Sequence, residues 1–163
     1  MDDENLLRAA KALLTQAQAH GLKLAAAESC TGGLITATLV RVPGSSAVVE
    51  RGFVTYSNEA KIEMLGVPEA LIARRGAVSM EVAVAMAEGA LAHARAELAV
   101  AVTGVAGPDG GSADKPVGLV HIAAARKNGP RLHEEKRFGA IGRENVQRET
   151  VAAAFALVMR VLA

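Results

Sequence analysis

Two short apolar runs, each followed directly by a glycine-rich turn, constrain the fold of this chain more than any other feature. Residues 22–27 form the first run and lead into the turn over residues 28–33, ESCTGG. Residues 98–102 form the second run and lead into residues 103–111, the most glycine-dense loop in the chain. Runs of this length are typical of buried strands, and helical spacing begins after Gly33. The pattern predicts an open α/β sheet, in which ligands lie at the carboxyl ends of the strands.

The rest of the sequence alternates helical and strand patterns. A first helix is expected where acidic residues precede apolar residues at helical spacing, and Gly21 ends it. The Asn128-Gly129 pair between residues 117–125 and 132–138 predicts an antiparallel hairpin. We therefore predict an α/β fold, a three-layer sandwich with a mixed, mostly parallel sheet and a late antiparallel hairpin. The other expected elements are a helix after Gly33, a strand over residues 48–56 interrupted near Arg51-Gly52, and helices over 59–65, from 67 through 72, from the cap Ser79 to about 93, and over 143–162.

Composition excludes several classes of protein. About half of the 163 residues (51%) are apolar, which is enough for one core, so a single domain is expected over residues 1–163. A formal net charge of +1, three Phe, one Tyr and no Trp argue against a nucleic-acid partner. No apolar segment is long enough to span a bilayer, so no membrane partner is expected. One cysteine and no export signal favour a reducing, cytoplasmic location.

Ser29 is the candidate nucleophile, because it lies where a strand passes into a helix and helix N-terminal amides favour negative charge. Its hydroxyl needs a base. The four histidines are scattered over helix ends and strands, whereas Lys61 is expected in a first helical turn, where the macrodipole and partial burial lower the pKa of its amine. Tyr56 is expected at the same mouth of the sheet, where it relays a proton or orients the pair. The alternatives are a solvated surface Lys61 and a Tyr56 that only packs at the rim of the core.

The two glycine-rich turns and one arginine are the candidate substrate-binding elements. Backbone amides of such turns hold an oxyanion or a phosphate, although each turn also fits a tight bend that merely needs positive φ. Arg143 begins the last expected helix, where a cation is unfavourable, and this position hints at an anionic ligand. Cys30 fits a small buried filler better than a nucleophile, and no cluster of residues has metal-ligand spacing. The candidate binding residues in the turns are Thr31, Gly32, Gly33, Thr103, Gly104 and Gly107.

Four collinear motifs carry a family resemblance. They are residues 27–33 (AESCTGG), 52–58 (GFVTYSN) followed by Lys61, 76–79 (GAVS) and 103–108 (TGVAGP). Together they resemble the C-terminal domain of the competence/damage-inducible protein CinA, whose stand-alone form is the nicotinamide-nucleotide amidase PncC. The resemblance runs from the first expected helix to the last.

The resemblance implies an activity. It implies hydrolysis of the carboxamide of nicotinamide mononucleotide to nicotinic acid mononucleotide and ammonia, a step of pyridine nucleotide salvage, with no cofactor. It also implies a serine nucleophile, a lysine base and an assisting tyrosine, which fall on Ser29, Lys61 and Tyr56. The expected partners are a small nucleotide and other copies of the chain in a homo-oligomer. Two rival functions are a non-catalytic nucleotide-binding module and an interaction domain whose alanine-rich helices, 82–91 and 146–162, form an oligomer interface.

Overall fold

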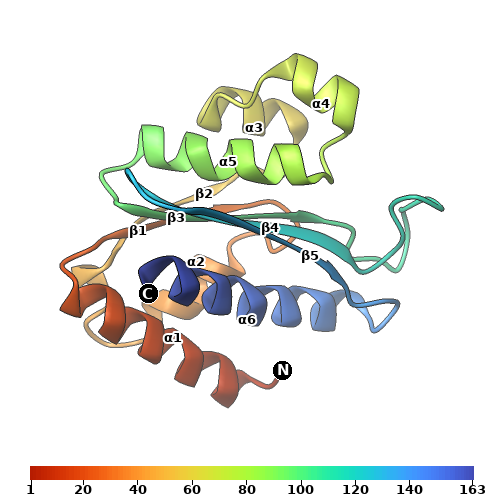
Figure 1. Ribbon diagram of the computed structural model, residues 1–163. Coiled ribbons are helices and arrows are strands. Elements are labelled where there is room, and N and C mark those ends of the chain that lie inside the picture. The colour runs from red at the N-terminus through yellow and green to blue at the C-terminus, as the bar shows by residue number, and fades with distance from the viewer.

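A five-stranded sheet forms the middle layer of the molecule, and the computed structural model describes all residues from 1 to 163 (Figure 1). The strands lie in the order β2-β1-β3-β4-β5. β1 pairs in parallel with β2 and β3, while β4 pairs antiparallel with both β3 and β5, so β4 alone runs against the others. The strands are β1 (Leu24–Glu28), β2 (Val49–Val54), β3 (Leu98–Gly104), β4 (Leu119–Arg126) and β5 (Arg131–Arg137).

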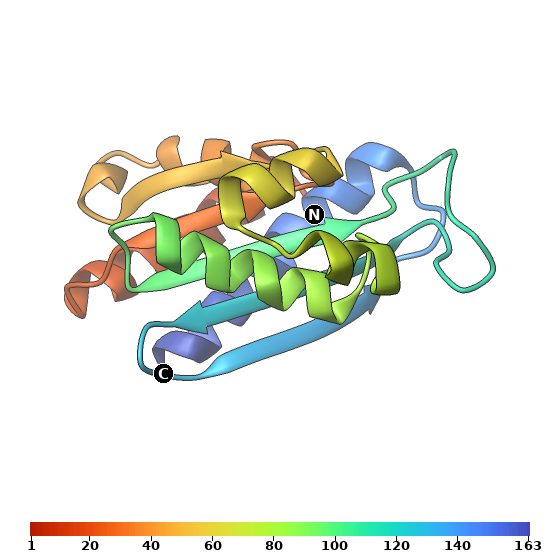
Figure 2. The ribbon, with the colours of Figure 1, turned by 90° about the horizontal axis from the view of Figure 1, so that it is seen from above.

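Helices cover both faces of the sheet. Figure 1 shows one group of helices on each face of the sheet, and in Figure 2, seen from above, the first of these groups lies in front of the strands. The first group is α3 (Asn58–Leu65), α4 (Glu69–Arg75) and α5 (Met80–His93). The second is α1 (Asp3–Ala19), α2 (Leu34–Val40) and α6 (Arg143–Leu162). The predicted fold class, a three-layer α/β sandwich with a mixed sheet and a late hairpin, is confirmed.

The two faces of the sheet carry different side chains. Towards α5 the three central strands present mainly alanine, in the pairs Ala25/Ala27, Ala99/Ala101 and Ala123/Ala125. Towards α1, α2 and α6 they present mainly larger residues, among them Leu98, Val100 and Ile122. Alanine leaves room for a close helix, and the buried face of α5 is itself mostly small, with Ala83, Ala87 and Ala90 around Met86. Small residues on both surfaces allow close packing in a chain that has few aromatic side chains.

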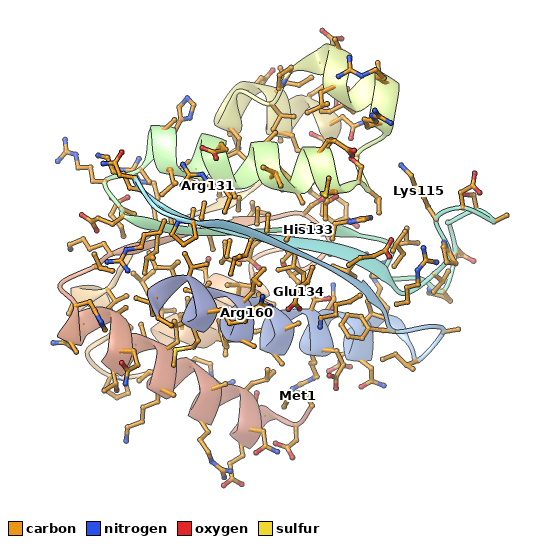
Figure 3. The ribbon with its side chains drawn as sticks, in the orientation of Figure 1. Met1, Lys115, Arg131, His133, Glu134 and Arg160 are labelled. Atoms are coloured by element: carbon orange, nitrogen blue, oxygen red, sulfur yellow. The ribbon has the colours of Figure 1, made fainter.

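Ion pairs fix the edge strand β5 to both helical layers. Arg131 of β5 pairs with Glu88 of α5, and Glu134 of β5 pairs with Arg160 of α6 (Figure 3). Charged side chains also line the open edge of the strand, which discourages pairing with another sheet.

The carboxyl ends of three parallel strands meet at one edge of the sheet. Glu28, the last residue of β1, lies beside Val54 of β2 and Val102 of β3. The segments that follow, including the turn after β1 and the loop after β3, therefore converge there. None of the helices combines the length and the apolar character needed to cross a membrane.

Two details differ from the sequence-based expectation. The strand expected over residues 48–56 is not broken at Arg51-Gly52; β2 is continuous, and its register shifts so that Leu24 pairs with Val49 but Ala25 pairs with Arg51. One extra residue, Glu50, is accommodated as a bulge. The helix expected through Ile72 extends to Arg75, where Gly76 ends it with φ 77°.

Candidate active site

Ser29 is the first residue after β1 and is only 8% exposed. Its amide donates a hydrogen bond to the carbonyl of Val102 on β3 (3.1 Å), so the serine is anchored to the neighbouring strand. The chain then turns sharply, with Gly32 and Gly33 at φ 58° and 108°, a conformation that suits glycine. This turn holds the hydroxyl of Ser29 at the carboxyl edge of the sheet.

Lys61 approaches Ser29 from α3 and is almost fully buried, with 1% of its surface exposed. Ser57 caps this helix by accepting a hydrogen bond from the amide of Ala60 (3.0 Å). The Nζ atom of Lys61 lies 3.0 Å from the Oγ atom of Ser29 and donates to the carbonyl of Thr55 (3.0 Å). The carbonyls of Tyr56 and Ser57 are farther away, at 3.4 and 3.5 Å. The structure therefore joins the two residues that the sequence proposes as nucleophile and base.

All of these partners of Lys61 are uncharged oxygens. No carboxylate lies within ion-pair distance of its amine, although a buried ammonium normally requires one. Burial lowers the pKa of Lys61 from its ordinary value of 10.5, opposed by weaker attractions to Cys30 and Glu59. Lys61 is not the solvated surface lysine that the sequence left open.

Tyr56 and Arg143 form a second pair in the same pocket. The Tyr56 hydroxyl accepts a hydrogen bond from Arg143 (2.9 Å), and Arg143 also donates to the carbonyl of Gly107 (2.9 Å). No hydrogen bond joins the Tyr56 hydroxyl to Ser29 or Lys61. Tyr56 is 61% exposed, so its ring stands at the pocket and is not a packed rim residue.

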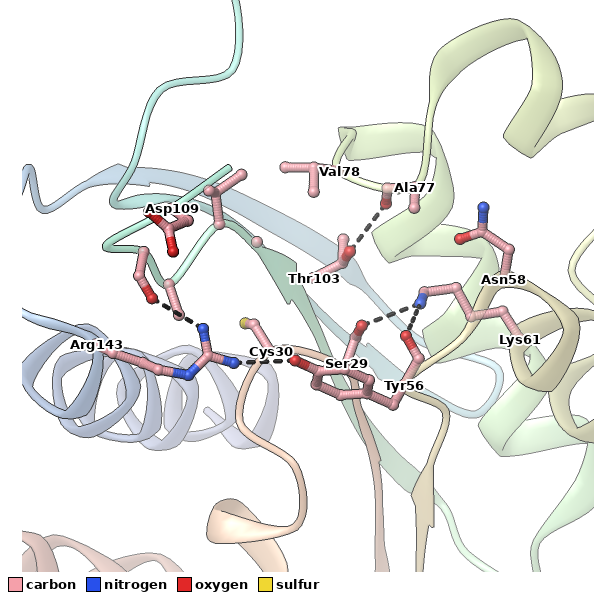
Figure 4. A pocket seen from close by; sticks show the side chains of 14 residues that line it. Ser29, Cys30, Tyr56, Asn58, Lys61, Ala77, Val78, Thr103, Asp109 and Arg143 are labelled. Carbon is pink, nitrogen blue, oxygen red and sulfur yellow. Dashed lines mark hydrogen bonds between the residues drawn. The ribbon is translucent and has the colours of Figure 1, made fainter. Parts of the chain in front are cut away.

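A pocket of about 300 Å³ collects these groups (Figure 4). In Figure 4 Lys61 and Arg143 lie on opposite sides of Ser29. Of the candidate binding residues, Thr103, Gly104, Gly107 and Arg143 line the pocket. The Thr103 hydroxyl donates to the carbonyl of Ala77 (2.9 Å) and so fixes the loop before α5 as one wall. The full lining is Ser29, Cys30, Tyr56, Asn58, Lys61, Ala77, Val78, Thr103, Gly104, Val105, Ala106, Gly107, Asp109 and Arg143.

Thr31, Gly32 and Gly33 are not part of this lining. The Thr31 hydroxyl donates to Glu28 (2.6 Å), and the Gly32 amide donates to the carbonyl of Ser29 (3.1 Å). These groups shape the turn. The amides of Cys30, Ala106 and Gly107, which do belong to lining residues, have no acceptor within the chain.

Glu28 has a structural position that the sequence analysis did not identify. It is fully buried, and its carboxylate accepts four hydrogen bonds, from the Thr31 hydroxyl, the Ile35 amide, and the amide and hydroxyl of Thr36. α2 has no side-chain cap at Gly33, so Glu28 supplies the acceptors that its first amides need. The signal in the sequence was an acid directly before the serine.

The remaining reactive side chains lie apart from this chemistry. Burial raises the pKa of the Cys30 thiol to about 12, so it fits the predicted filler role. His121 and His133 contact each other (2.9 Å) outside the pocket lining. No group of three or more His, Cys, Asp or Glu residues has an arrangement that fits a metal ion.

Comparisons with known proteins show the family and the fold of this chain. The family model described as the CinA C-terminal domain matches residues 7–162. The chain is 46% identical over 154 residues to the nicotinamide-nucleotide amidohydrolase PncC of Escherichia coli K12, covering 94% of this chain and 93% of that protein. It is 50% identical over 143 residues to a CinA-like protein of Syntrophobacter fumaroxidans, but spans only 33% of that longer protein.

Solved structures show the same architecture. The crystal structure of the competence/damage inducible protein CihA from Agrobacterium tumefaciens superposes with a TM-score of 0.96 at 49% identity, covering 100% of this chain and 98% of that one. A CinA superfamily protein from Escherichia coli gives a TM-score of 0.91 at 33% identity, with coverages of 98% and 92%.

Proposed function

Because this chain belongs to the CinA C-terminal domain family, we propose that it hydrolyses the carboxamide of nicotinamide mononucleotide, releasing ammonia and nicotinic acid mononucleotide. The relative named for this activity matches over nearly its whole length, whereas the longer CinA-like protein matches over a third. The observation that carries the proposal is the 3.0 Å contact between Ser29 Oγ and a buried lysine that has no acidic partner.

The state of Lys61 decides whether it acts as a base. An ammonium has only N–H donors, whereas a neutral amine has two N–H groups and one lone pair. The surroundings can serve the neutral form: two N–H groups donate to the carbonyls of Thr55 and Tyr56, which leaves the lone pair to take the hydroxyl proton of Ser29 across the 3.0 Å contact. Burial without a counter-ion favours this form, as a general base near neutral pH requires.

The reaction follows in two halves. Ser29 Oγ attacks the carboxamide carbon while Lys61 takes the hydroxyl proton, which gives a tetrahedral oxyanion. When the carbon–nitrogen bond breaks, Lys61 returns the proton to the leaving nitrogen, so ammonia departs and an ester on Ser29 remains. Water then attacks the ester with Lys61 again as base, and the carboxylic acid leaves as Ser29 regains its proton.

Backbone amides are the proposed oxyanion donors. The Cys30 amide follows the nucleophile directly, and the Ala106 and Gly107 amides belong to the loop after β3; none has an acceptor within the chain. Donors fixed in advance stabilise the charge that develops on the carbonyl oxygen. Thr31, Gly32 and Gly33 then act by shaping the turn.

The substrate phosphate is assigned to the Arg143 side of the pocket. Arg143 has no carboxylate partner within ion-pair distance, and its guanidinium is held by Tyr56 and Gly107. A guanidinium held in this way suits phosphate, which accepts hydrogen bonds from its planar N–H groups. Tyr56 accordingly positions Arg143 and borders the substrate.

The decisive test is ammonia release from nicotinamide mononucleotide by the purified chain. Ser29→Ala is expected to lower kcat by a factor of about 10³ or more, because the covalent route is lost, while the fold persists. Ser45→Ala is a matched control, since Ser45 is equally buried (9%) but lies outside the pocket, and its rate should stay within a factor of about two. A folded Ser29→Ala enzyme with normal turnover refutes the mechanism.

A further inference from the structure

Asp109 is the only carboxylate among the residues that line the active pocket. It belongs to the glycine-rich loop after β3, and Figure 4 places it on the same side of Ser29 as Arg143. It forms no ion pair with Arg143 or with any other cation of the chain. The carboxylate is therefore left available to a ligand.

An acid in this position is unfavourable for an anionic ligand alone. A carboxylate repels phosphate, and it shares its side of the pocket with the arginine assigned to the phosphate. A hydrogen-bonding group without charge already exists in the lining, because the side chain of Asn58 makes no hydrogen bond within the chain. Neutral hydroxyl groups of a ligand thus do not require the charge of Asp109. A positive charge in the ligand, by contrast, requires the negative charge of Asp109.

The proposed substrate carries such a charge. In a nicotinamide nucleotide the ring nitrogen is bonded to the ribose, so the ring is a permanent pyridinium cation. With the carboxamide at Ser29 and the phosphate at Arg143, the cationic ring is placed between them, in a pocket whose lining includes Tyr56 and the carboxylate of Asp109. Lys61 offsets none of this charge, since it acts as a neutral base.

We propose that Asp109 is a specificity-determining residue that selects nucleotides whose amide-bearing ring is positively charged. This inference rests on the proposed function, because it takes the pyridinium nucleotide as substrate. Asp109 acts through its charge and takes no part in proton transfer. A nucleotide with the same carboxamide, ribose and phosphate but a neutral ring loses the benefit of this carboxylate.

The test combines a charge change in the ligand with a charge change in the residue. The ligands are nicotinamide mononucleotide and its 1,4-dihydro form, which differ in ring charge and keep the same substituents. Dissociation constants are measured by titration calorimetry in the Ser29→Ala background, so that neither ligand is consumed. The residue variants in that background are Asp109→Asn, Asp109→Glu and, as a control, Asp114→Asn, an acid of the same loop that lies outside this pocket.

The preference for the cationic ligand is the quantity to compare. Asp109→Asn is expected to reduce that preference by up to about 5-fold, the upper range for the charge interaction of an exposed residue, while binding of the dihydro form stays the same or tightens. Asp109→Glu and Asp114→Asn are expected to keep the preference within about 2-fold, a change within the noise of surface substitutions.

Other outcomes overturn the inference. If Asp109→Asn weakens both ligands equally, Asp109 binds the ribose hydroxyls or supports the loop, and its charge does not select the ring. If neither affinity changes, Asp109 has no role in binding. Ammonia release by the wild-type chain is measured separately. If the wild-type chain releases ammonia but Asp109→Asn leaves the ligand preference unchanged, only the role of Asp109 is rejected. If the wild-type chain releases no ammonia, the proposed function itself is rejected.

Discussion

At the scale of single residues, the buried lysine beside Ser29 is the most informative feature of the site. Its pKa is lowered by burial, and the proposed mechanism uses its neutral form as the base. The rate constant at low substrate concentration is therefore expected to rise with pH through an apparent pKa below 10.5, since raising the pH increases the neutral fraction. A pH profile of kcat/KM measures this; a rate that stays flat through that range contradicts Lys61 as the base.

Lys61→Arg separates the base from a simple positive charge. Arginine keeps the charge but does not lose its proton near neutral pH, so kcat is expected to fall by a factor of about 10³. If Lys61 only attracts the substrate phosphate, the arginine variant should keep part of its activity. The loss would then appear as a higher KM. The split between kcat and KM is thus the deciding measurement.

The sequence predicted this residue geometry unevenly. Ser29 and Lys61 were expected together, because one follows a buried strand and the other opens a helix at the same sheet edge, and they lie 3.0 Å apart. The contact between Tyr56 and Arg143 was not expected, since it joins residues 87 positions apart and depends on how α6 packs. The sequence also did not predict that the Thr31 side chain points towards Glu28, because no local sequence pattern specifies this direction.

At the scale of secondary-structure elements, Glu28 controls how α2 begins. Glu28→Gln keeps the shape but places an amide NH₂ against donors such as the amides of Ile35 and Thr36. We expect a loss of about 2 kcal/mol in the free energy of unfolding, because a buried donor is left without an acceptor. Urea unfolding measures the change. Glu4→Gln, an exposed acid paired with Arg8, is the control and should cost under about 0.5 kcal/mol.

Contact between α3 and α5 depends on Gly89. A Cβ atom at this position would lie 2.0 Å from the carbonyl oxygen of Leu65, the last residue of α3. Alanine favours a helix by about 1 kcal/mol over glycine, but here it pushes α3 away from α5. We expect Gly89→Ala to destabilise the fold by about 2 kcal/mol, within the range of overpacked cores, and to lower kcat because α3 carries Lys61.

A second substitution on α5 provides the comparison. Ala92→Gly changes an exposed position and should cost under about 1 kcal/mol with no effect on kcat, since only helix propensity is altered. Thermal unfolding and ammonia release measure both variants. If Gly89→Ala is more stable than the wild type, α3 and α5 do not need this close approach.

At the scale of the whole molecule, the sandwich places the proposed base and the proposed phosphate-binding arginine in different layers. Lys61 belongs to the layer of α3, α4 and α5, whereas Arg143 belongs to α6 on the other face, and Ser29 lies at the sheet between them. The sequence predicted the layers, because the alternation of patterns specifies them. It did not predict which alanines face α5, since strands buried on both faces show no alternation of polar and apolar residues.

The alanine side chains that the central strands present towards α5 allow a test of these separate roles of the two helical layers. Ala101 is fully buried towards α5 between Ala27 and Ala123, while Ala124 is buried on the opposite face, towards α6. Ala101→Val and Ala124→Val add the same two methyl groups beneath different layers. Each is expected to destabilise the fold by about 1–3 kcal/mol through overpacking.

The kinetic effects of these two variants should differ. Ala101→Val displaces α5 and, with it, the helix that carries Lys61, so kcat is expected to fall several-fold, since small misplacements of catalytic groups are costly. Ala124→Val displaces α6, so Arg143 shifts and KM is expected to rise while kcat is retained. Steady-state kinetics on both folded variants measure the split. If both substitutions lower kcat equally and leave KM unchanged, the position of Arg143 affects the chemical step. In that case the two helical layers do not have separate roles in chemistry and in substrate binding.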